Sequence, residues 1–161
     1  MQLTGKEIID QKIIKNFCDA GIQQQGIDVR IKKVKVVEDT WGCVPSQGKT
    51  VIPSYSDIDP INGYFELEPN YYEIELEEGC EIPSNATLHY KTRSSLVRCG
   101  ATVHSGQFDA GFKTDNMGCF LNVMKPIKIE VGARIAQAIV FTSSDVDNLY
   151  DGQWQNDKHR K

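Results

Sequence analysis

The chain of 161 residues is long enough for one domain that buries a sizeable core without disulfides or metals. Its net charge of -4 excludes a general nucleic-acid coat, which needs a basic face, but not a nucleotide held by a few cations. The five cysteines are odd in number and lack CxxC spacing, which argues against a disulfide framework or structural zinc and favours a reducing cytoplasm. Residues 1–14 carry charges throughout, so we expect neither a signal peptide nor a membrane span.

One helix is predicted near the start, over Thr4–Ala20. Thr4 can cap it, with Glu7 as the capping-box partner. Apolar residues then recur at near-helical spacing as far as Phe17, and Gly21 provides a stop. We expect no other helix in the chain.

Beyond this helix the apolar period changes to two. Turn residues such as Gly42, Pro60 and Gly132 separate the alternating runs, which cover 27–31, 33–36, 64–68, 73–77 and 127–131. Many short strands with regular turns indicate a β-sandwich or β-barrel. The segment Trp41–Asn62 is rich in Pro, Gly, Ser and Asp and is predicted to be a long excursion between strands.

Four stretches offer chemistry. In Arg93–Arg98 two arginines flank two serines, and guanidinium forks match phosphate oxygens, although a solvated polar turn has the same composition. In Phe108–Lys113 an aspartate lies between aromatic residues and can accept a proton from water, or it can be an ordinary turn residue. Gly132–Phe141 is predicted to be a turn and a buried strand, and Gly26–Arg30 is an ordinary strand by itself.

The order and spacing of these stretches resemble the dUTPase and dCTP deaminase superfamily, especially its deaminase-like branch. The resemblance runs from Leu3 to Gln155. It implies a mainly β fold, a dUTPase-like β-barrel of jelly-roll or β-clip type with an N-terminal helix. It also implies a single domain over 1–161, in which a mobile tail, 142–161, closes over the site.

The resemblance also assigns residue roles. Asp109 would orient the attacking water as general base, close to the deoxyribose. Asp28 and Arg30 would support the phosphate site. Binding of the triphosphate falls to Arg93, Ser94, Ser95, Arg98 and Gln137, and binding of the base and sugar to His104, Ser105, Gly106, Phe108 and Asp109. Mg²⁺ would be held by triphosphate oxygens and water, with no direct protein ligand.

Four departures from the family pattern bear on activity. The family's D-P-G-F-K-G motif reads Asp109-Ala110-Gly111-Phe112-Lys113-Thr114, without its proline and last glycine. The position of the deaminase glutamate holds Cys119, although the asparagine that follows it is in place as Asn122. A thiol is a poor proton shuttle, so we expect loss of deamination. The hairpin between Gly100 and Asp109 is short, which affects base specificity. The tail lacks the family's lysine, for which Lys158 or Arg160 are candidate replacements.

The predicted function is therefore a cytoplasmic, Mg²⁺-dependent dUTP diphosphatase, a hydrolase that gives dUMP and pyrophosphate. The resemblance implies a homotrimer with sites between subunits, and no nucleic-acid polymer or membrane as partner. Two alternatives stay open. One is a dCTP deaminase, alone or bifunctional, and the other is a non-catalytic nucleotide-binding regulatory relative.

Overall fold

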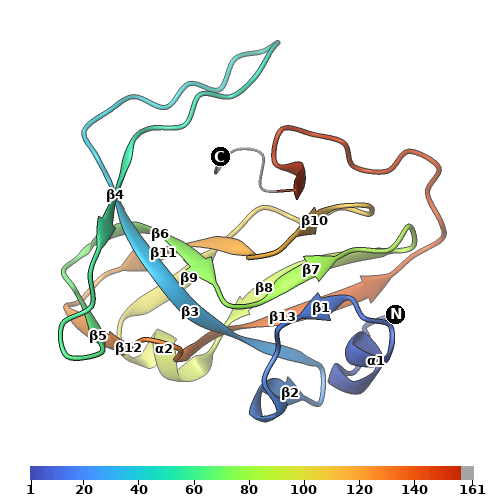
Figure 1. The fold of residues 1–161 in the computed structure, drawn as a ribbon, viewed down its shortest axis with the longest axis horizontal. Coiled ribbons are helices and arrows are strands. Elements are labelled where there is room, and N and C mark those ends of the chain that lie inside the picture. The colour runs from blue at the N-terminus through green and yellow to red at the C-terminus, as the bar shows by residue number, and fades with distance from the viewer. Residues whose placement is uncertain (157–161) are drawn as a thin grey trace.

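The computed structural model describes residues 1–156 and is built almost entirely from strands (Figure 1). Two short helices, α1 (Gly5–Asp10) and α2 (Ser94–Arg98), and a 3-10 turn, η1 (Asp19–Gly21), accompany them. The strands are β1 (Ile14–Lys15), β2 (Ile22–Gln23), β3 (Gly26–Val37), β4 (Tyr55–Ile58), β5 (Tyr64–Leu67), β6 (Asn70–Leu76), β7 (Gly79–Glu81), β8 (Ala86–Thr92), β9 (Ala101–His104), β10 (Lys113–Thr114), β11 (Gly118–Val123), β12 (Ile127–Glu130) and β13 (Arg134–Thr142). The mainly β prediction is confirmed.

The main sheet curls into a nearly closed barrel. Its strands follow the order β8-β13-β3-β6-β11-β9, and β2 and β4 pair with β3. The two ends of this path meet through Thr92 of β8, whose hydroxyl oxygen accepts from the Val103 amide of β9 at 2.9 Å. Two small sheets, β1-β7-β10 and β5-β12, complete the body. Neighbouring strands are antiparallel. Because successive side chains of a strand point to opposite faces, they alternate between the barrel interior and the outside.

The predicted N-terminal helix is present but far shorter than Thr4–Ala20. Its capping box is formed as expected, with the Thr4 amide donating to Glu7 Oε2 at 2.8 Å. The helix ends at Asp10, and Lys12 then takes a positive φ of 56°. Ile14 pairs with Cys80 of β7, so Ile13 and Ile14, which were assigned to the helix, are buried beyond its end, Ile14 as a strand residue. The second helix, α2, was not predicted. The composition of Arg93–Arg98 left open a phosphate-binding stretch or a solvated polar turn, and neither interpretation included a helix.

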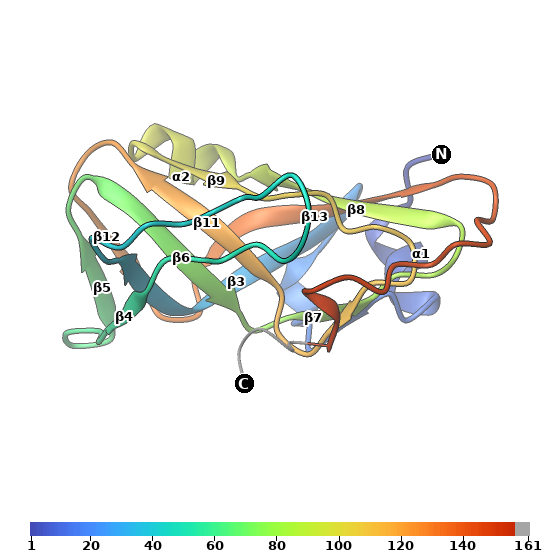
Figure 2. The same ribbon diagram turned by 90° about the horizontal axis from the view of Figure 1, so that it is seen from above.

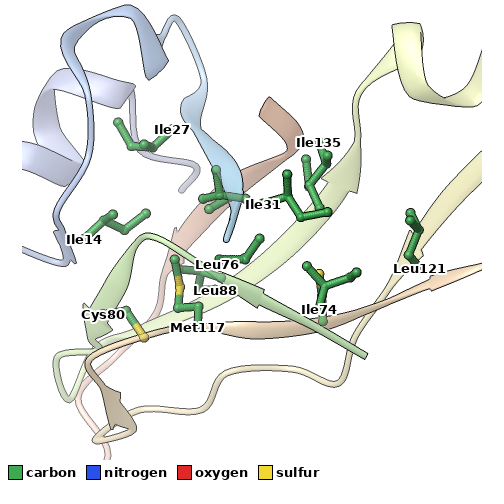
Figure 3. Packing of buried hydrophobic residues seen from close by; sticks show 14 of the residues in the cluster. Ile14, Ile27, Ile31, Ile74, Leu76, Cys80, Leu88, Met117, Leu121 and Ile135 are labelled. Carbon is green, nitrogen blue, oxygen red and sulfur yellow. The ribbon is translucent and has the colours of Figure 1, made fainter. Parts of the chain in front are cut away.

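The barrel interior is one cluster of buried aliphatic side chains (Figure 3). Ile27, Val29 and Ile31 of β3 are fully buried, as their alternation predicts. Each such side chain contributes roughly 1.5–3 kcal/mol relative to exposure. Labelled examples in Figure 3 are Ile14, Ile27, Ile31, Ile74, Leu76, Cys80, Leu88, Met117, Leu121 and Ile135.

A long arm joins β3 to β4 and projects away from the barrel (Figure 1). It accounts for most of the excursion predicted over Trp41–Asn62, and β4 follows it. Cys43 and Val51 pair across the arm through two backbone hydrogen bonds, of 2.8 and 2.9 Å. Trp41 is 94% exposed on it. Among residues 1–156, neither helix has the length and apolarity that crossing a membrane requires.

Candidate functional site

A cavity of about 550 Å³ opens beside the β6–β11 part of the sheet. The arm, the hairpin after β9, the strands themselves and the C-terminal tail all contribute to its wall. Its lining residues are Ile52, Tyr55, Glu73, Ser105, Gly106, Gln107, Phe108, Asp109, Phe112, Thr114, Asn116, Gly118, Cys119, Phe120, Tyr150 and Trp154. Apolar side chains with a few polar groups are the usual lining of a small-molecule site.

Asp109 stands on a tight turn at the wall of this cavity. Its carboxylate is exposed and accepts a hydrogen bond from Gln107 Nε2 at 2.7 Å. Phe108 and Phe112 on either side of it meet edge to face, with ring centroids 5.4 Å apart. Gly111 takes a φ of +88°, which an L side chain rarely adopts, and this lets the turn close. The arrangement leaves the carboxylate free to accept a proton inside the cavity.

Cys119 lines the same cavity, so the deaminase-glutamate position does face it. Burial, and secondarily the negative charge of Glu73, raise the pKa of its thiol far above the ordinary value. The group is therefore neutral at physiological pH and supplies neither a base nor a thiolate.

Sequence reasoning missed Glu73, which brings a second carboxylate to this wall. It lies on β6 directly opposite Phe120 of β11, and Lys35 Nζ is 3.5 Å from its carboxylate. In the sequence Glu73 belongs to an alternating run that is typical of a solvated strand face. Glu73 reaches the cavity through the register of β6 with β11, and the residues around Glu73 in the sequence do not predict that register.

A second polar cluster surrounds Asp28 of β3, which is only 2% exposed. Its carboxylate is 3.1 Å from Arg93 Nε and 3.4 Å from Arg134 Nη1. Burial raises the pKa of Asp28, and the two guanidinium groups oppose that rise. Gln137 lies opposite Asp28 in the β3–β13 pairing. The predicted Arg93, Asp28 and Gln137 thus come together. Arg134 joins them; it lies within the stretch Gly132–Phe141 but was not predicted as a site residue.

The other predicted phosphate residues lie on α2. Ser94, Ser95 and Arg98 are exposed on this helix, which begins directly after Arg93. Arg30 is instead engaged in the fold, because its Nε contacts the buried Glu78 carboxylate at 2.6 Å. Its Nη2 also donates to the Asn16 carbonyl at 2.6 Å.

Within one chain, the predicted site residues therefore lie in two separate groups, one at the cavity and one at Asp28 and α2. Ser105, Gly106, Phe108 and Asp109 line the cavity, whereas His104 stands outside its lining, hydrogen-bonded to Thr102 at 3.0 Å. Helix α2 lies apart from the tail in both views (Figures 1 and 2). Within residues 1–156, no lysine or arginine lines the cavity.

The same described part of the chain holds no group of three or more His, Cys, Asp or Glu side chains placed to bind a metal ion. All five cysteines are free thiols.

Comparison with known proteins identifies the family. The family described as dCTP deaminase-like matches residues 2–143. The chain belongs to this dCTP deaminase-like family. The deoxyuridine 5'-triphosphate nucleotidohydrolase of Methanocaldococcus jannaschii is 32% identical over 151 residues, which cover 90% of this chain and 96% of that protein. A probable deoxyuridine 5'-triphosphate nucleotidohydrolase of Halobacterium salinarum is 31% identical over 151 residues, 90% of this chain and 89% of its own length.

Among solved structures, the crystal structure of 2'-deoxycytidine 5'-triphosphate deaminase from Agrobacterium tumefaciens superimposes with a TM-score of 0.66 at 15% identity. The match covers 86% of this chain and 48% of that longer chain. At this identity it shows the fold alone, and it confirms the β-barrel predicted for this family member.

Proposed function

We propose that this protein is a dUTP diphosphatase, which hydrolyses dUTP to dUMP and pyrophosphate. The observation that carries the proposal is the composition of the cavity wall, where Asp109 offers an exposed carboxylate and Cys119 replaces the deaminase glutamate. The names of its dCTP deaminase-like relatives from M. jannaschii and H. salinarum support the same substrate.

In the proposed reaction, water attacks the α-phosphorus of dUTP. The new bond joins the water oxygen to that phosphorus, and the bond to the bridging oxygen of the departing pyrophosphate breaks. Asp109 takes a proton from the water as it attacks. Mg²⁺ on the triphosphate would neutralise charge that develops on the phosphate oxygens. The described residues fit this role, since Asp109 and Glu73 on the cavity wall offer carboxylates that could accept hydrogen bonds from water molecules on such an ion.

The other predicted site residues would contact the phosphates, the base and the deoxyribose of the nucleotide. Arg93 and Arg98, with Ser94, Ser95 and Gln137, would bind the phosphates, because guanidinium forks and hydroxyls suit phosphate oxygens. Ser105, Gly106 and Phe108 would bind the base and deoxyribose, with His104 at the end of the same hairpin. Asp28 would hold Arg93 in place, given the 3.1 Å contact between them. Arg30 would act further away, through its ion pair with Glu78.

We further propose a homotrimer whose sites form between subunits. The supporting observation is that the cavity has carboxylates but no basic side chain from residues 1–156, while Arg93 and α2 lie elsewhere. A neighbouring copy would then supply the cations that a triphosphate needs.

The proposal also covers the domain organisation, the C-terminal tail and the cellular location. The chain would act as a single domain over 1–161, with tail 142–161 covering the site. Lys158 and Arg160, the candidate replacements for the tail lysine, lie outside the described residues. The free thiols are consistent with a cytoplasmic enzyme.

A dCTP deaminase is the second candidate, and Glu73 is the observation that favours it, since it brings a carboxylate to the cavity from another strand. Incubation of the protein with dUTP or dCTP and Mg²⁺, followed by chromatography, separates the candidates. The diphosphatase is supported if dUTP is converted to dUMP while dCTP is left unchanged. Uracil nucleotides formed from dCTP would support the deaminase, and no turnover of either nucleotide would leave the regulatory relative.

A further inference from the structure

We infer that Gln155 is a positioning residue for Asp109, because its side chain fixes the turn that carries this aspartate. The inference rests on the proposed hydrolase function, since it concerns the group proposed as the base. The tail would then brace the catalytic turn, in addition to covering the bound nucleotide.

The tail supplies hydrogen-bond partners for the main chain of this turn. The Tyr150 amide donates to the Ala110 carbonyl at 2.8 Å. Gln155 Nε2 donates to the Gly111 carbonyl at 2.9 Å, and Gln155 Oε1 accepts from the Lys113 amide at 2.8 Å. Gln155 therefore bridges the turn on both sides of Phe112, within a few residues of Asp109.

Gln155 is itself held firmly. It is only 8% exposed, and its Nε2 also donates to the Tyr150 carbonyl at 2.9 Å. An amide buried to this extent requires partners for its carbonyl and its NH₂ group, and these three bonds provide them. A tail that only covered the nucleotide would not need to bury a polar side chain in the turn.

Packing between the tail and the turn is equally close. A Cβ added to Gly111 would lie 2.7 Å from Leu149 Cβ, so the two backbones leave no room between them. The Tyr150 ring meets Phe112 edge to face at a centroid distance of 5.4 Å, and Phe112 meets Phe108 in the same way. Both aromatic neighbours of Asp109 are thus supported, directly or through one ring, by the tail.

This support matters because the Asp109 side chain is exposed. Burial does not fix its carboxylate, so its position depends on the main chain of the turn and on the hydrogen bond from Gln107 just before it. A general base must lie within hydrogen-bond reach of the attacking water. A displacement of about 1 Å can lower the rate by about 10²-fold. Loss of the Gln155 contacts should therefore act mainly on kcat.

The first test replaces Gln155 in the full-length chain. For Gln155→Ala we expect kcat for dUTP to fall by about 10- to 100-fold, while KM changes by less than about threefold. Gln24→Ala is the matched control, since it makes the same substitution at an exposed glutamine outside both the cavity lining and the tail. The control should keep the wild-type kcat. An unchanged kcat in Gln155→Ala, or a raised KM alone, would overturn the inference.

Two further measurements separate positioning from a general loss of structure. In an Asp109→Asn background, Gln155→Ala should cost little of the residual rate, because the group it positions is gone. Hydrogen exchange at the Lys113 amide should accelerate in Gln155→Ala, whereas the Gly111 amide, which donates to the Ile82 carbonyl at 2.9 Å, should stay protected. The inference would be contradicted if Gln155→Ala lowered kcat by the same factor in the Asp109→Asn background as in the wild type. Unchanged hydrogen exchange at the Lys113 amide would also contradict it.

Deletion of residues 150–161 provides a second variant. It should reproduce the loss of kcat and the faster Lys113 exchange while the barrel stays folded. Wild-type protein that fails to hydrolyse dUTP would refute the proposed function and this inference with it. Active wild type with a fully active Gln155→Ala would refute this inference alone.

Discussion

Arg93→Ala should affect both the stability of the protein and its affinity for substrate. Arg93 Nε lies 3.1 Å from the buried Asp28 carboxylate, and Arg134 Nη1 approaches the same oxygen at 3.4 Å. The substitution leaves Asp28 with the longer of these contacts. A hydrogen bond to a charged group contributes about 1.5–3 kcal/mol, so we expect the free energy of unfolding to fall by about 1.5 kcal/mol.

The sign of the pH dependence follows from the pKa of Asp28. Burial already raises this pKa, and Arg93 is the first of the two cations that oppose the rise. Without Arg93 the folded-state pKa lies further above the value in the unfolded chain. The folded form is then favoured while Asp28 is protonated, and this stability is lost as pH rises through the folded-state pKa. The difference between wild type and Arg93→Ala should therefore be larger at pH 7 than near pH 4.

Urea unfolding at the two pH values measures the stability effect, and steady-state kinetics measures KM for dUTP. We expect KM to rise about tenfold, the equivalent of about 1.4 kcal/mol, if Arg93 binds a phosphate. The double variant Arg93→Ala/Asp28→Asn removes the buried charge as well and should recover the lost stability. Recovery of KM along with stability would show that Arg93 acts only through the fold.

Other predictions concern the chemistry and the assembly. Asp109→Asn should lower dUMP formation by about 10²- to 10⁴-fold, since the amide cannot take a proton, while equilibrium titration shows dUTP binding retained. Near-normal turnover by a folded Asp109→Asn protein would remove Asp109 from the base role. Sedimentation should give about three times the mass of the 18.1 kDa chain, and a species of one chain mass would refute the trimer. Wild-type protein should release no uracil nucleotide from dCTP, because the buried Cys119 thiol stays protonated. Ammonia release from dCTP would contradict this expectation.

The strands were predictable because each one has a buried face. Ile27, Val29 and Ile31 alternate with polar residues in the sequence and are fully buried in β3. The end of the first helix was not predictable in this way. Ile13 and Ile14 fit a helical period, but they pack where β1 pairs with β7, some 65 residues further on. Long-range pairing of this kind decides the conformation of a short apolar run.

The candidate site shows a similar division. Asp109 was recognisable because a local motif surrounds it, and the structure places it on the cavity wall. Glu73 reaches the same wall only through its register with Phe120, and Gln155 reaches the turn through side-chain hydrogen bonds. These contacts depend on how distant segments meet, which no local pattern in one sequence records.

The charges around the cavity bear on how a triphosphate would bind. Asp109 and Glu73 place two carboxylates on its wall, and residues 1–156 contribute no basic side chain to it. Like charges repel, so this wall alone disfavours a polyanion. The exposed Arg98 on α2 is a cation, beside the exposed hydroxyls of Ser94 and Ser95, and this helix lies away from the tail in both views (Figures 1 and 2). Under the proposed trimer, each chain would contribute these two groups to two different nucleotide sites, so that neighbouring copies complete one another.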